Sequence, residues 1–110
     1  MAIDNSLYDS LQNTYIKMTD YFNQIQLGRE HSIMIVKHEE LAELLEKLDI
    51  EAIEEQWSDI NALHKELDDI KEDAKKVLEV LNSDGDSLTT VDYIVSGLDN
   101  VFAKIAKLII

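Results

Sequence analysis

The chain contains no cysteine and no proline, and only three of its 110 residues are glycine. Without cysteine it forms no disulfide, no thiolate zinc site and no cysteine nucleophile. Without proline, helices can run uninterrupted, and the abundant leucine, isoleucine, glutamate, lysine and alanine residues all favour them. These absences predict an all-α fold.

Long hydrophobic runs are also missing. No stretch of about 18 apolar residues exists to span a bilayer, and residues 1–10 lack the basic and apolar segments of a secretory signal. We therefore expect a soluble, cytoplasmic protein. A chain of this length can bury a core without metal or disulfide, so we expect one domain over residues 1–110.

Basic residues are scarce compared with acidic ones. The formal net charge is −13, and residues 39–86 hold 17 of the 23 acidic residues but five of the ten basic ones. Such a field repels nucleic-acid backbones and anionic membranes, and it favours cations or basic protein surfaces. We expect a protein partner, with no direct binding to nucleic acid or membrane.

Apolar residues recur at steps of three and four, which predicts amphipathic helices. The pattern gives four of them, over residues 5–27, 32–48, 49–81 and 88–108. The second is expected to bury one stripe of Ile33, Met34, Leu41, Leu44, Leu45 and Leu48. Gly28 suits the left-handed cap that ends the first helix, and Asp49 suits the N-cap of the third. The turn-forming residues 82–87 separate the last two helices.

The third helix stands out because it spans about 30 residues and about 45 Å. We expect it to be the spine of a four-helix bundle. Gln56 falls on its apolar stripe, between the lines of Ile53 and Ile60, and His64 near that stripe is expected to be structural. Because the chain finishes on Leu-Ile-Ile, we expect that end to pack against the bundle or against a second copy in a dimer.

One acidic constellation suggests chemistry. Glu40 and Glu43 lie three residues apart on the second helix, and Gln56 and Asp59 lie three apart on the third. An antiparallel hairpin that turns at Asp49 would bring the two pairs together. These side chains would then either hold a metal ion or simply face the solvent on two neighbouring helices.

The sequence ELAE, twelve residues, then QWSD resembles the MazG-type all-α nucleoside-triphosphate pyrophosphohydrolases, whose pattern is ExxE, a spacer and ExxD. The resemblance implies that Glu40, Glu43 and Asp59 hold magnesium ions for cleavage to a nucleotide monophosphate and pyrophosphate. Gln56 stands where the family has its third acid. A neutral amide binds magnesium less well, so this departure predicts weaker metal binding and reduced turnover.

The segment LLEKLDIEAIEE, residues 44–55, also resembles flagellar export chaperones, in which a helical hairpin binds a partner helix. Such binding needs an apolar groove with a polar rim. We expect a non-enzymatic interaction module without a cofactor; the alternatives are the magnesium-dependent hydrolase, active or decayed, and a purely structural subunit. The residues expected to contact the partner are Trp57, Ile60, Leu67, Ile94, Leu98 and Phe102.

Overall fold

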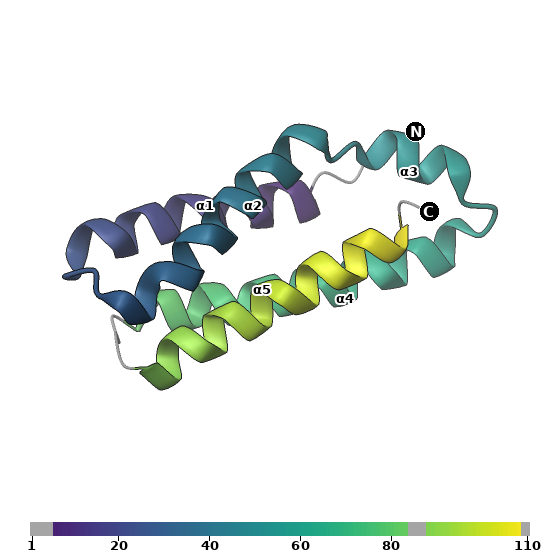
Figure 1. Ribbon diagram of the computed structural model, residues 1–110. Helices are drawn as coiled ribbons and strands as arrows, with labels where there is room; N and C mark the ends of the chain where they lie inside the picture. The colour runs from purple at the N-terminus through teal and green to yellow at the C-terminus, as the bar shows by residue number, and fades with distance from the viewer. Residues whose placement is uncertain (1–5, 84–87, 109–110) are drawn as a thin grey trace.

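The computed structural model describes residues 6–83 and 88–108, and over this part of the chain the fold is all helical, as the sequence predicts. Its helices are α1 (Ser6–Gln24), α2 (Ser32–Lys47), α3 (Ile50–Gln56), α4 (Ile60–Asn82) and α5 (Leu88–Leu108), and a 3₁₀ turn, η1 (Arg29–His31), precedes α2 (Figure 1). The described residues include no β-strand.

The helices form a rod of 46 × 21 × 20 Å. α1 packs against α2 and α4, and α5 packs against the same two helices. Figure 1 shows these four helices lying lengthwise, with α3 extending beyond α2 at one end of the rod. One apolar stripe from each long helix fills the centre, with fully buried side chains that include Leu11, Met34, Ile70 and Ile94.

The expected third helix is two helices, so the prediction of a continuous helix over residues 49–81 is wrong. α3 ends at Gln56, Trp57 is extended (φ −93°, ψ 128°), and α4 begins at Ile60. The break has a local cause. Asp59 is the N-cap of α4, and its Oδ1 accepts a hydrogen bond of 3.1 Å from the backbone N–H of Ala62.

The expected hairpin of the second and third helices is also absent. Instead of folding back on α2, α3 continues in the same direction, and the chain reverses between α3 and α4 (Figure 1). Asp49 does cap α3 as predicted, since its Oδ1 accepts a 3.1 Å hydrogen bond from the N–H of Ala52. The cap starts a helix there without turning the chain around.

The first connection differs from the prediction as well. α1 ends at Gln24, and Gly28 is extended (φ −118°, ψ −173°), so it is not a left-handed cap. Its N–H donates a 2.9 Å hydrogen bond to Nδ1 of the buried His31, which fixes the turn into α2. α2 starts at Ser32 as predicted, although Ile33, expected to be buried, is 44% exposed.

The contact between α4 and α5 is close, and we call it the α4–α5 seam. A Cβ atom on Gly97 of α5 would collide with the Val77 side chain of α4, so glycine permits the two backbones to approach. Lys104 of α5 donates hydrogen bonds of 2.8 and 2.6 Å to Asp69 and Asp73 of α4. These carboxylates raise the pKa of Lys104 to about 12.

The predicted bounds of the last helix are confirmed, because α5 runs from Leu88 to Leu108. α4 ends at Asn82, where the predicted turn starts, but residues 84–87 of that turn lie outside the described residues. So do Ile109 and Ile110, on which the expected dimer contact falls. No helix that the structure describes has both the length and the apolar character needed to cross a bilayer.

Candidate functional site

The four residues of the predicted magnesium site are all exposed but lie in two different places. Glu40 and Glu43 lie on α2, whereas Gln56 ends α3 and Asp59 caps α4. Because α3 extends away from α2, its seven residues alone add about 10 Å between the two pairs. The structure therefore does not bring these pairs together.

Two further observations concern this constellation. Within residues 6–83 and 88–108, no group of three or more histidine, cysteine, aspartate and glutamate side chains is placed to hold a metal ion. Gln56 is exposed, so its predicted position on a buried apolar stripe is wrong, and the cause is the break after α3. His64 is likewise exposed, and its Nε2 lies 3.8 Å from Oε1 of Glu54.

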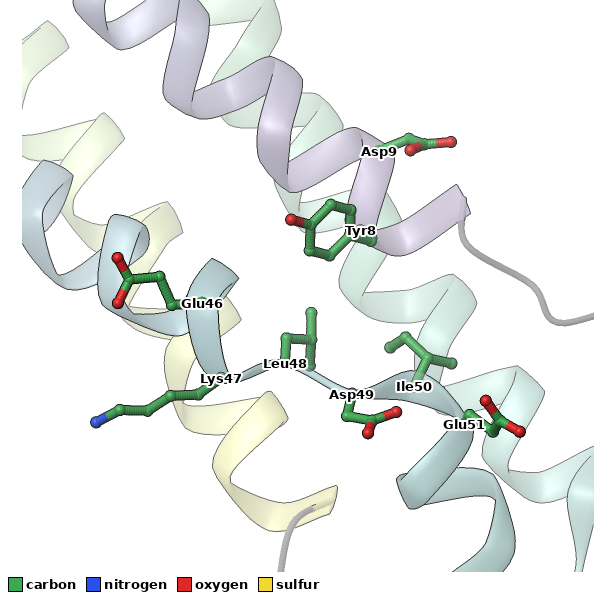
Figure 2. A pocket seen from close by; sticks show the side chains of 8 residues that line it. All are labelled: Tyr8, Asp9, Glu46, Lys47, Leu48, Asp49, Ile50 and Glu51. Carbon is green, nitrogen blue, oxygen red and sulfur yellow. The ribbon is translucent and has the colours of Figure 1, made fainter.

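A hollow of about 640 Å³ lies between the start of α1 and the link from α2 to α3. Figure 2 shows Tyr8 and Leu48 extending toward each other across this gap, while Asp9 and Lys47 point away from it. The carboxylate of Asp49 is engaged as the cap of α3. The acidic side chains at this hollow therefore diverge, which is not the arrangement of a cation site.

A second hollow, which we call the α2–α5 groove, has a different character. Its volume is about 320 Å³ and its lining is mainly apolar. The residues that line it are Glu40, Glu43, Leu44 and Lys47 from α2, and Phe102, Ile105 and Ala106 from α5. Leu44 and Phe102 are partly buried against the core, so they form a fixed apolar floor beneath an acidic rim.

A polar link closes the groove at the end nearer the start of α2. Nζ of Lys37 lies 2.7 Å from Oδ1 of Asp99 on α5 and 3.4 Å from Oε2 of Glu40, and it is 6.0 Å from the ring centroid of Phe102. The hydrogen bond to Asp99 raises the pKa of Lys37 above its usual range. Lys37 therefore stays charged and holds α2 to α5 at this point.

The two helices that form the groove run in the same direction (Figure 1). Lys37 meets Asp99 at one end, and Leu44 lies with Ile105 and Ala106 farther along both helices. The carboxyl ends of α2 and α5 therefore lie at the same end of the molecule. Both carry the partial negative charge of a helix C-terminus, which Lys47 in the last turn of α2 and Lys107 in the last turn of α5 offset.

The residues expected to contact a partner are divided between the core and the surface. Leu67, Ile94 and Leu98 are at most 1% exposed, so in this structure they stabilise the core and no partner can reach them. Trp57 and Ile60 are partly exposed at the α3–α4 break, where Nε1 of Trp57 donates a 3.5 Å hydrogen bond to the Leu108 carbonyl oxygen. Phe102 lines the α2–α5 groove.

Sequence reasoning missed Leu44, Ala106 and Lys47 as members of one surface. The pattern places Leu44 on the core stripe of its helix, and nothing local indicates which helix lies beside it. The available signal was the step of four residues from Phe102 to Ala106, which places both on one face of α5. This spacing identifies one face of α5 but does not indicate that α2 packs beside it.

An aromatic cluster around His38 joins α1 to α2. The His38 ring stacks on Tyr15 with centroids 4.1 Å apart and planes at 7°, and Phe22 approaches it edge-on at 5.3 Å. Nε2 of His38 lies 3.0 Å from Oγ1 of Thr19. Burial lowers the pKa of His38, which favours its neutral form in this packed position. The cluster serves the packing of the two helices.

Comparison with known proteins adds no relative: no family model, no curated protein and no solved structure matches the chain.

Proposed function

We propose that the protein is a non-enzymatic interaction module that binds a protein partner in the α2–α5 groove. The observation that carries this proposal is the groove itself, where the apolar floor of Leu44, Phe102 and Ile105 meets the exposed carboxylates of Glu40 and Glu43. Interfaces of this kind combine an apolar centre with a polar rim. An apolar side chain of the partner would displace water from the floor.

The charge distribution supports a basic partner. The net charge is −13, and the carboxylates of Glu40 and Glu43 are exposed at the groove. Complementary charge mainly raises the association rate. Salt limits the range of this attraction to about 10 Å at 0.1 M. Binding should therefore weaken as the salt concentration rises.

A magnesium-dependent pyrophosphohydrolase is the alternative function. It would require Glu40 and Glu43 of α2 to meet Asp59, which caps α4 and is separated from α2 along the chain by the whole of α3. For this reason we favour the interaction module. Titration with Mg²⁺ and a panel of nucleoside triphosphates, followed by an assay for released pyrophosphate, tests the hydrolase directly; metal-dependent release would overturn our preference.

We also propose that α1, α2, α4 and α5 act as one four-helix bundle in the cytoplasm, and that the apolar end of α5 pairs with a second copy. Such a dimer would leave the α2–α5 groove open to the partner if the contact is confined to that end. Light scattering over a range of protein concentrations tests the pairing, and a monomer at the highest concentration would exclude it.

The groove is tested by site-specific crosslinking. A photoreactive residue at Lys47, an exposed member of the groove, should form an adduct with a discrete protein, whereas one at the exposed Glu66 of α4 should not. The captured protein is then purified and titrated against two variants. Ala106→Glu in the groove should weaken binding at least tenfold, and Ala103→Glu, exposed on the same helix outside the groove, should not. Equal affinity for both variants would refute the proposal.

A further inference from the structure

We propose that the docking surface extends beyond the α2–α5 groove along α2, over Ile33 and Val36, and that its occupant is a basic amphipathic helix of the partner protein. This inference rests on the proposed function. It adds the second half of the surface and the chemistry of the segment that binds there.

The exposed apolar residues of α2 carry the extension. Ile33 is 44% exposed and Val36 is 45% exposed, although α2 buries Met34 and Leu41 completely. Steps of three and four residues connect Ile33 and Val36 to the groove residues Glu40, Glu43 or Leu44, and Lys47, so all of them share one face of the helix. The start of this face is apolar, its middle carries the two glutamates, and its end borders the α2–α5 groove.

The dimensions of this face suit a helix. From residue 33 to residue 47 it extends about 21 Å, which is about four helical turns. A helix lying in such a groove presents apolar side chains at steps of three and four residues, so successive turns can meet Val36 and then the floor at Leu44 and Phe102. A single extended side chain could fill the groove but would leave Ile33 and Val36 exposed.

The middle of the face selects positive charge. Glu40 and Glu43 are exposed there, and the nearby Lys37 lies closer to Asp99 (2.7 Å) than to Glu40 (3.4 Å). Lysine or arginine on the flanks of the bound helix would pair with Glu43 and share Glu40 with Lys37, which Asp99 holds in place.

A second copy of the chain fits this face poorly. An antiparallel pairing of α2 with its own copy over residues 33–47 would be centred on Glu40. The two-fold symmetry would then place Glu40 against Glu40 of the other copy, which is unfavourable, and Glu43 against Lys37, whose charge is already paired with Asp99. A basic helix from another protein avoids this repulsion.

The first experiment uses two synthetic helical peptides of 16 residues as probes. Both carry the same leucine stripe, and their flanking positions are lysine in one and glutamate in the other. NMR titration of the full chain should show the lysine peptide binding at least tenfold more tightly, with shifts at Ile33, Val36, Glu43 and Phe102. Equal affinity for the two peptides, or shifts confined to α4, would overturn the inference.

Matched variants then separate the two halves of the surface. Val36→Ser should weaken the lysine peptide at least threefold, and Ile16→Ser, a similarly exposed apolar residue on α1, should leave its affinity unchanged. Glu43→Gln should reduce the dependence of binding on salt, whereas Glu66→Gln on α4 should not. If Ala106→Glu abolishes binding while Val36→Ser has no effect, the groove is retained and the extension is refuted. If neither variant matters, both proposals fail.

Discussion

The α4–α5 seam and the α2–α5 groove are two sides of the same helix with opposite properties. At the seam, Gly97 has no side chain and Val77 occupies the space, so the helices close on each other. At the groove, α2 and α5 leave a hollow of about 320 Å³ next to the Lys37–Asp99 ion pair. A lysine bridges the helices in both places, but at the Gly97–Val77 contact there is no room for a further side chain, whereas the groove has that room.

This difference indicates a division of roles. Close packing adds stability because every gap that is filled gains contacts and excludes water. In the isolated chain, the apolar side chains of an open groove remain in contact with water. A partner that covers them removes this apolar surface from water, which favours binding. We expect changes at the seam to alter stability and changes at the groove to alter binding.

The largest expected effect is at the closed side. Gly97→Leu should lower the free energy of unfolding by about 2 kcal/mol, because the new side chain must displace Val77 from the seam. Helix propensity alone would favour leucine, so a loss reports the clash. Urea denaturation measures it, with Ser96→Leu at the neighbouring exposed position as control. Unchanged stability would mean that the seam is no more tightly packed than the groove.

A smaller effect is expected from the lysine beside the groove. Lys37→Met should lower the free energy of unfolding by about 0.5–1 kcal/mol, since its side chain is 16% exposed and it contacts both Asp99 and the Phe102 ring. Urea denaturation at low and high salt measures the loss, which should shrink as salt screens the ion pair. Asp99→Asn should reproduce most of it. A salt-independent loss would assign the effect to packing instead.

The lysine of the seam should contribute about 0.5 kcal/mol or less, because water screens the exposed Asp69 and the partly exposed Lys104. Its signature is the pH dependence. The folded pKa of about 12 lies above the ordinary 10.5, so the contribution is complete below pH 10.5 and is lost as the pH rises toward 12. The melting temperature of Lys104→Met should approach that of the parent as the pH rises through that window. The difference between Lys107→Met and the parent should stay the same over the same pH range.

The smallest effect is expected from filling the groove. Ala106→Leu should change the free energy of unfolding by no more than about 0.5 kcal/mol, because Ala106 is exposed and has open space beside it. The same substitution at Ala74, which is 1% exposed in α4, should cost about 1–3 kcal/mol. Thermal melts compare the two variants. A similar loss at both positions would show that the groove is closed in solution.

Much of the helical layout could be predicted from local chemistry. Each signal acts within a few residues: the lack of proline, the apolar stripe of α5 and the aspartate cap at Asp49. The structure confirms the helices and the cap that these signals predict. The partner surface depends on which helices become neighbours. Leu67, Ile94 and Leu98 have the same apolar character as Phe102. Only the packing of the helices decides that the first three are buried and that Phe102 lines the groove.

The break at residues 57–59 has a sequence signal that also fits a second interpretation. Asp49-Ile-Glu-Ala and Asp59-Ile-Asn-Ala share one pattern ten residues apart, and in both the aspartate accepts a 3.1 Å hydrogen bond from the alanine N–H. The sequence pattern predicts a helix cap for the first, whereas the family resemblance implies a metal ligand for the second. The spacing of three and four residues between apolar side chains continues across the break, so this periodicity alone does not indicate where the helix ends.

The short helix between those two caps has a consequence for the dynamics of the chain. α3 has its own cap at Asp49, is followed by the cap of α4 at Asp59, and buries only Ile50 and Ile53. A segment with so little buried surface unfolds locally at a lower free energy than the core helices. The backbone amides of α3 should therefore exchange with deuterium well before those of α4 and α5, while the remaining helices stay folded.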